Sequence, residues 1–273
     1  MENNMATRDK KLDTKSKKAK SKVGLEIITD KPESTDTFST PGPLRGASEL
    51  ILETRKGQMI FEGRRPDPDR KKAAIIGLKS FARYLRVIWD TTTNNDPYAD
   101  WWLLKVERAI EAKEKWINDK YDEYTKILGQ FDNLSHEVAH SISPIKCELR
   151  FSIPYSYRGA MLLMKYDELI KIIMTANHVA LVESIRAHQD IEDSSKAART
   201  VFHAVTGYRF TGVTRDDIYA NNKIAEKAAE LMGPCPTGIL DDEVVPKFES
   251  GKSMIMRKLR QKKSKSNNTA TTA

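Results

Sequence analysis

The segment Lys146-Cys-Glu-Leu-Arg-Phe-Ser-Ile153 alternates polar and apolar side chains without a break. Alternation with a period of two predicts a β-strand with one buried face and one exposed face. The apolar face would carry Cys147, Leu149, Phe151 and Ile153. The polar face would carry Lys146, Glu148, Arg150 and Ser152.

The apolar period lengthens after this strand. We predict a turn over residues 154–157, a short apolar run over 160–166, and a helix that begins with Asp167 as its N-cap. A second helix would start at Ile185 or Ser194 and end near Val205. The stretch from Ile145 to about Thr206 therefore predicts the order strand, helix, helix.

This order is the local order of ribbon-helix-helix DNA-binding proteins. In those dimers each chain contributes one strand to a ribbon that lies in the major groove. The same pattern also fits half of an ordinary α+β core, in which helices cover a hairpin. A rival ribbon exists at residues 48–55, whose outward residues would be Glu49, Ile51, Glu53 and Arg55. We predict that this rival strand forms a hairpin with residues 58–61, turning at Lys56-Gly57.

Two long helices are expected between these strands. Asp67-Pro68 and Asp96-Pro97 each combine an N-cap with proline at the first helical position. They predict helices from Pro68 to about Thr91 and from Pro97 to about Phe131. The second helix is long enough to be an arm that another subunit completes. Basic residues crowd the first helix, either as a phosphate-facing patch or as a solvated face: Arg70, Lys71, Lys72, Lys79, Arg83 and Arg86.

The chain of 273 residues carries its positive charge at its ends. Residues 1–22 hold eight Lys/Arg and three Asp/Glu, and residues 252–273 hold seven and none, so the net charge of +8 leaves −4 for the body. We expect a disordered basic tail over 1–41, a folded body over 42–250 and a disordered basic tail over 251–273. A helix from Arg215 to Met232 would close the body. No run approaches the ~18 apolar residues of a membrane span, and two unrelated cysteines suit a cytoplasmic protein.

One motif suggests chemistry. His136-Glu-Val-Ala-His140 fits H-E-x-x-H, in which two histidines one helical turn apart bind zinc and the glutamate acts as a base. However, Pro144 ends any helix close to the second histidine, and no downstream signature supplies a third ligand. We therefore expect no catalytic residue, no metal and no cofactor, and a zinc hydrolase remains only a remote alternative.

Several blocks resemble the AcaB family of transcriptional regulators of conjugative plasmids and integrative conjugative elements. The blocks include Asp96-Pro-Tyr-Ala-Asp-Trp-Trp-Leu103 and Gly207-Tyr-Arg-Phe-Thr-Gly-Val-Thr-Arg215, together with Gly42-Pro-Leu-Arg45 and Ala74-Ile-Ile-Gly-Leu78. The resemblance covers about residues 42–233. It implies a homodimeric ribbon-helix-helix-type protein that binds promoter DNA and activates conjugative-transfer genes, with RNA polymerase as a further candidate partner.

We therefore predict an α+β dimer with additional long helices. Bases would be contacted by Lys146, Glu148, Arg150 and Ser152, because glutamate accepts from cytosine and arginine pairs with guanine. Phosphates would be held by Arg55, Lys56, Arg64, Arg65 and Lys71. The alternative from another class is a structural component of the conjugation apparatus that does not read DNA sequence.

Overall fold

The chain divides into two units, residues 1–45 and 46–273, and only the second contains residues that the structure describes. The computed structural model describes residues 46, 48–67, 69, 73–130 and 136–271, with side chains as far as residue 262. The disordered tail expected over residues 1–41 lies outside this part of the chain.

The two strands that the sequence offered as rival ribbons pair with each other. Strand β1 (Ser48–Leu52) and strand β2 (Ile145–Leu149) run antiparallel, with Glu49 opposite Glu148 and Ile51 opposite Lys146. A two-stranded ribbon is thus complete within one chain. A second chain is therefore not needed to form the ribbon.

The hairpin expected at Lys56-Gly57 is wrong, because helix α1 (Arg55–Glu62) begins there. The side chain of Thr54 caps the helix by accepting from the Gly57 N–H. Gly57 is buried, and a Cβ at this position would overlap the carboxylate of Asp167. The glycine therefore permits a close approach between helices rather than a turn.

Helix α2 (Leu78–Thr92) starts about ten residues later than expected. Before it, Ile75 exchanges two backbone hydrogen bonds of 2.8 Å with Arg64. Helix α3 (Pro97–Leu128) matches the prediction closely. Its N-cap Asp96 accepts from the N–H groups of Tyr98 and Ala99, as the Asp-Pro pair indicated.

The segment expected to be a turn, a short apolar run and a helix is one continuous helix, α4 (Pro154–His178). Proline occupies its first turn, where a missing N–H has no consequence for the helix. Asp167 is consequently not an N-cap but a buried residue within α4 that accepts from the N–H groups of Glu53 and Thr54. Helix α5 (Ser184–His203) agrees with the earlier of the two predicted starting points.

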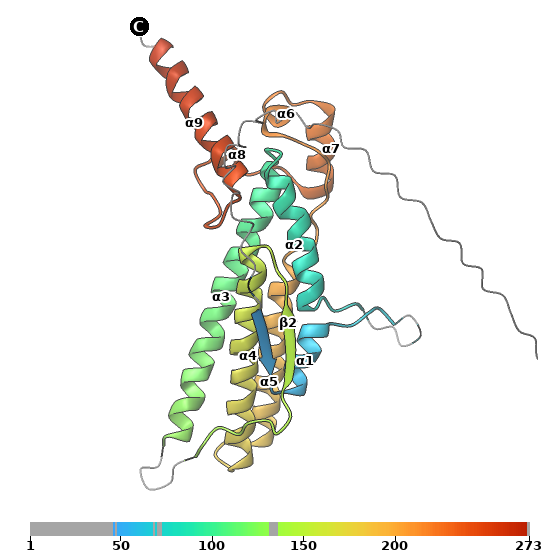
Figure 1. Cartoon of the computed structure of the whole chain (residues 1–273), viewed down its shortest axis with the longest axis vertical. Helices are drawn as coiled ribbons and strands as arrows, with labels where there is room; N and C mark the ends of the chain where they lie inside the picture. The colour runs from blue at the N-terminus through green and yellow to red at the C-terminus, as the bar shows by residue number, and fades with distance from the viewer. Residues whose placement is uncertain (1–45, 47, 68, 70–72, 131–135, 272–273) are drawn as a thin grey trace, which may run out of the picture. The chain divides into compact units, whose positions relative to one another are not determined.

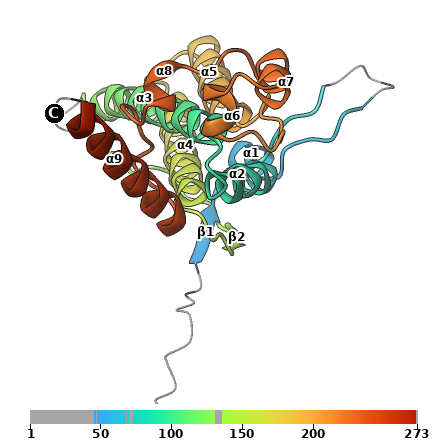
Figure 2. The same ribbon diagram turned by 90° about the horizontal axis from the view of Figure 1, so that it is seen from above.

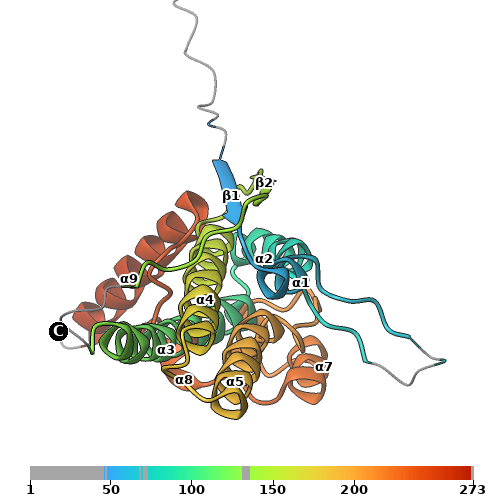
Figure 3. The ribbon, with the colours of Figure 1, turned by 90° about the horizontal axis from the view of Figure 1, so that it is seen from below.

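Helix α4 is the centre of the fold. It packs against α3 on one side and α5 on another, and it also contacts α1, α2 and β1 (Figures 1 and 3). Residues on nearly every side of α4 are buried for this reason, including Tyr155, Leu163, Tyr166 and Ile170. The view from above shows the ribbon on one side of the helices, next to α4 (Figure 2). The long helix α3 lies along α4 instead of projecting as an arm.

The described C-terminal part contains several helices joined by non-helical segments. The helix expected over residues 215–232 is divided into α6 (Arg215–Tyr219) and α7 (Lys223–Met232), followed by α8 (Thr237–Leu240). Helix α9 (Gly251–Thr271) replaces the flexible tail that the composition suggested. Within the described residues the fold is therefore mainly helical, with one small antiparallel sheet. The described residues include no helix that is both long and apolar enough to cross a membrane.

Candidate nucleic-acid interface

The outer face of the ribbon carries two of the four residues predicted to contact bases, and the other two follow the ribbon directly in the chain. On the inner face, Leu50, Leu52 and Leu149 are buried against the helices. Glu49, Ile51, Lys146 and Glu148 point outward, and Arg150 and Ser152 remain exposed just beyond the end of β2. The alternation read from the sequence therefore corresponds to a real division between a packed and an exposed face.

Charges alternate on this outer face. The like-charged pair Glu49 and Glu148 sits directly across the strands, an arrangement that is unfavourable by itself. Arg150 offsets it with two bonds to the Glu148 carboxylate, of 2.9 and 3.0 Å, and Lys146 lies 3.9 Å from Glu49. The Glu148 carboxylate raises the pKa of Arg150. Two acids and two bases make the face electrically neutral, so it offers polar contacts but little attraction for phosphate.

The rival set of base-contacting residues is divided by the fold. Glu49 and Ile51 belong to the outer face, but Glu53 turns away and accepts from the Lys171 ammonium at 2.6 Å. Lys171 is buried, and its hydrogen bond is the main reason why the pKa of Glu53 is lowered to about 2. Arg55 is the first residue of α1. Glu53 therefore serves the packing of the ribbon onto α4.

Two of the residues predicted to hold phosphates lie close together. Lys56 and Arg64 line a hollow that also contains Glu62 and Glu192. Lys56 pairs with Glu192 at 2.6 Å, and Arg64 donates to the Ala73 carbonyl at 2.9 Å. Arg55 and Arg65 are exposed, and Lys71 lies outside the described residues. These five positions stay predictions.

The H-E-x-x-H motif does not have the geometry that zinc binding requires. Residues 136–140 form neither helix nor strand, so His136 and His140 are not one helical turn apart on a common face. His140 instead places Nδ1 3.1 Å from the Glu53 carboxylate. No group of three or more candidate metal ligands occurs in the described part of the chain.

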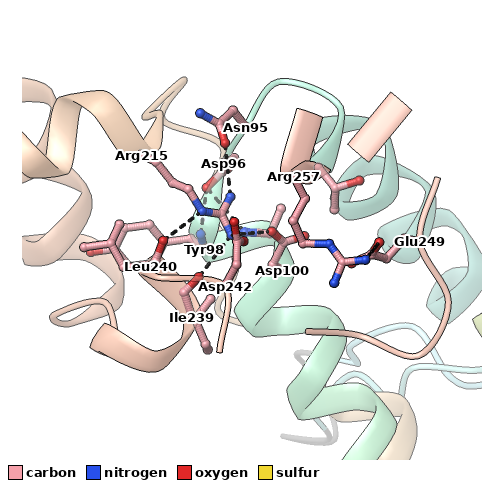
Figure 4. A network of polar contacts seen from close by, with 12 residues as sticks. Asn95, Asp96, Tyr98, Asp100, Arg215, Ile239, Leu240, Asp242, Glu249 and Arg257 are labelled. Atoms are coloured by element: carbon pink, nitrogen blue, oxygen red, sulfur yellow. Dashed lines mark hydrogen bonds and ion pairs between the residues drawn. The ribbon is translucent and has the colours of Figure 1, made fainter. Parts of the chain in front are cut away.

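The two longest blocks that resembled a family meet in a buried ionic network (Figure 4). Arg215, only 2% exposed, donates to Asp100 at 2.8 Å and to Asp242 at 3.0 Å. The same guanidinium donates to the carbonyls of Ile239 and Leu240. The network thus joins the start of α3, the start of α6 and the segment around α8.

A second contact joins the same two blocks. The hydroxyl of Tyr208 donates to Asp96 at 2.7 Å, and the indole N–H of Trp102 donates to the Thr206 carbonyl at 3.0 Å. Burial raises the pKa of Asp96 to about 6 against the opposing effect of the hydrogen bonds that Asp96 accepts from Tyr208 and from the N–H groups of Tyr98 and Ala99. The rings of Trp102 and Tyr208 also make a T-shaped contact. These motif residues therefore hold the fold together.

Helix α9 is fixed to the same network by polar contacts. Arg260 forms a bidentate pair with Asp242, with bonds of 2.9 Å, and Arg257 donates to Glu249 at 2.7 Å. Sequence reasoning missed this network. Its signal was the presence of charged residues inside motifs that are otherwise aromatic and apolar, which is typical of buried ion pairs.

Comparisons with known proteins agree with the motifs. A family model described as "Transcriptional regulator AcaB" matches residues 40–251. A crystal structure of selenomethionine-containing AcaB from uropathogenic E. coli is similar at 16% identity and a TM-score of 0.44, covering 72% of this chain and 95% of that chain. No curated protein matches the chain. The match over most of the length confirms the resemblance carried by the sequence blocks, and the chain belongs to the AcaB family of transcriptional regulators.

Proposed function

We propose that the chain is a sequence-specific double-stranded-DNA-binding regulator that activates conjugative-transfer genes in the cytoplasm. The observation that carries the proposal is the exposed polar face of the ribbon, fixed to the helical core by its buried apolar face. A two-stranded ribbon fits the major groove, which is about 12 Å wide. Lys146, Glu148, Arg150 and Ser152 are the side chains that would meet base edges.

Arg150 is the residue with the best chemistry for direct readout. Its guanidinium already forms a two-bond pair with a carboxylate, and the same fork matches the O6 and N7 atoms of guanine. Because Arg150 is 82% exposed, releasing Glu148 requires little energy. Glu148 would then be free to accept from a cytosine amine.

We propose that two chains bind as a homodimer. Each chain supplies a complete ribbon, so the second chain would add a second half-site instead of a second strand. A two-fold dimer would match a palindromic operator with half-sites one or more helical turns apart. Contact of such a dimer with RNA polymerase is part of the proposed activation.

Fluorescence anisotropy tests the proposal with promoter fragments of the protein's own element and with scrambled fragments. We expect one fragment to bind more tightly than its scrambled control, and Arg150→Ala to lose about tenfold or more of this preference. Size-exclusion chromatography with light scattering should show an unchanged dimer in the variant. Equal affinity of the wild type for all fragments would refute sequence-specific readout.

The structural-component alternative depended on a long helix free for assembly. Helix α3 instead has Val106, Ile110, Ile117 and Tyr124 buried against the rest of the same chain. No specific observation therefore favours assembly over DNA binding.

A further inference from the structure

A basic groove lies beside the ribbon. It has a volume of ≈ 310 Å³ and is lined by residues of α2 and by the connection from β2 to α4: Lys79, Ala82, Arg83, Arg86, Arg150, Phe151, Ser152, Ile153 and Ser156. Four of these are cations, and none of the described lining residues carries a carboxylate. The body of the chain outside the tails has a net negative charge, so this local concentration of positive charge is not a consequence of composition.

The packing of α2 on α4 places the cations there. Gly159, in the second turn of α4, is buried, and a Cβ on it would lie 2.6 Å from Cε1 of Phe81 in α2. The missing side chain therefore allows α2 to approach α4 closely. Lys79, Arg83 and Arg86 recur at intervals of four and three residues, so they share one exposed face of α2.

The N-terminus of α4 opens onto the same groove through Ser152, Ile153 and Ser156. No side chain of the described residues caps this end of the helix. Ser156 is only 1% exposed, and its hydroxyl has no hydrogen-bond partner among the described residues. A helix N-terminus without a cap, with a hydroxyl and cations around it, is suited to bind an anion.

The cations of the groove are weakly engaged. Arg86 lies 3.9 Å from Asp90, and both side chains are about 70% exposed. Lys79 lies over the ring of Phe61 at 5.2 Å, and Arg83 makes no ion pair with the described residues. These groups are therefore available to a ligand without breaking a buried contact.

We propose that this groove binds a backbone phosphate of the DNA whose bases the ribbon contacts, with Lys79, Arg83 and Arg86 as its cations and Ser156 as a hydrogen-bond donor. This inference rests on the proposed function and adds the electrostatic component that the neutral ribbon face lacks. Arg150 borders both surfaces, so a phosphate in the groove fixes the register of the ribbon.

Anisotropy titration of the full chain with a labelled random-sequence duplex across a salt series tests the groove. The variant Lys79→Gln/Arg83→Gln/Arg86→Gln should make the negative slope of log K against log salt shallower by about 1 or more. It should also weaken the affinity at about 0.1 M salt by about tenfold. Ser156→Ala should weaken binding in the same direction by a few-fold. Lys126→Gln, at the exposed C-terminal end of α3, should leave both quantities unchanged. Thermal unfolding should show that each variant is folded.

The outcomes separate the groove from the proposed function. Wild-type affinity and slope in the triple variant would overturn the groove proposal, even if promoter fragments are still distinguished from scrambled ones. Sequence preference is measured separately: a wild type that binds promoter and scrambled fragments equally would count against the proposed function, whereas Lys146→Ala, a ribbon residue outside the groove, should lose part of the wild-type preference. Titration with inorganic phosphate, monitored by the NMR chemical shifts of the backbone amides of residues 155–156, tests whether the groove binds a small anion. If the triple variant loses phosphate binding but keeps DNA affinity and slope, the DNA proposal is wrong.

Discussion

Replacement of Arg215 by alanine should destabilise the fold strongly. The change leaves the buried Asp100 carboxylate without its cation, whereas Asp242 keeps Arg260 as a partner. Loss of one member of a buried pair costs about 3–5 kcal/mol. For a body of this size, about 2–4 °C is lost per kcal/mol, so we expect the melting temperature to fall by about 6–20 °C.

The matched control is Arg209→Ala, which removes an exposed arginine from the same sequence block. Its effect on the free energy of unfolding should stay within about 0.5 kcal/mol. Urea denaturation followed by far-UV circular dichroism measures both variants. If Arg215→Ala were as stable as Arg209→Ala but deficient in DNA binding, the block would serve recognition and our structural interpretation of it would be refuted.

Two further changes test individual contacts. The pKa of Asp96 is about 6 in the folded state and 3.8 in the unfolded state, so the folded state holds the proton more tightly. The contribution of Asp96 to the free energy of unfolding therefore decreases by about 3 kcal/mol as the pH rises from below 3.8 to above 6. Asp96→Asn keeps a capping oxygen, so urea denaturation from about pH 4 to 7 should show this decrease in the wild type only. If the free energy of unfolding depended on pH in the same way in both proteins, the raised pKa would not belong to Asp96. Gly159→Ala should destabilise by about 1–2 kcal/mol, because overpacking against Phe81 outweighs the gain in helix propensity. Thermal melts of both variants test this, with Gly251→Ala as the control: a Cβ there meets no atom within 4 Å, so the change should be neutral or mildly stabilising. An equal loss of stability in both variants would show that the contact with Phe81 is not the cause.

Local patterns predicted elements well where one signal dominated. The alternation in residues 146–153 indicated β2 and its exposed side chains, and Asp96-Pro97 indicated the start of α3. Both signals operate over a few residues, so neither depends on distant parts of the chain.

Predictions failed where a residue type has two uses. Gly57 looked like a turn residue but allows α1 to approach Asp167, and Pro154 looked like a turn but occupies the first turn of α4. The contact that decides the role of Gly57 is with a residue more than 100 positions away in the chain. The role of Pro154 is decided by the helix that continues after it.

The pairing of the two strands could not be predicted from the sequence for a similar reason. Strands β1 and β2 are separated by more than 90 residues, and nothing in either strand specifies the other as its partner. The same applies to the groove, whose cations and helix N-terminus belong to two elements that the packing of α2 on α4, including Phe81 on Gly159, brings together.

The most direct test of base readout by the ribbon compares the full chain with its Arg150→Ala variant. Anisotropy with promoter and scrambled fragments at matched salt measures the sequence preference of each. We expect the wild type to prefer one promoter fragment and the variant to retain salt-dependent binding while losing most of this preference. An Arg150→Ala variant with the full preference of the wild type would show that the ribbon does not read the bases.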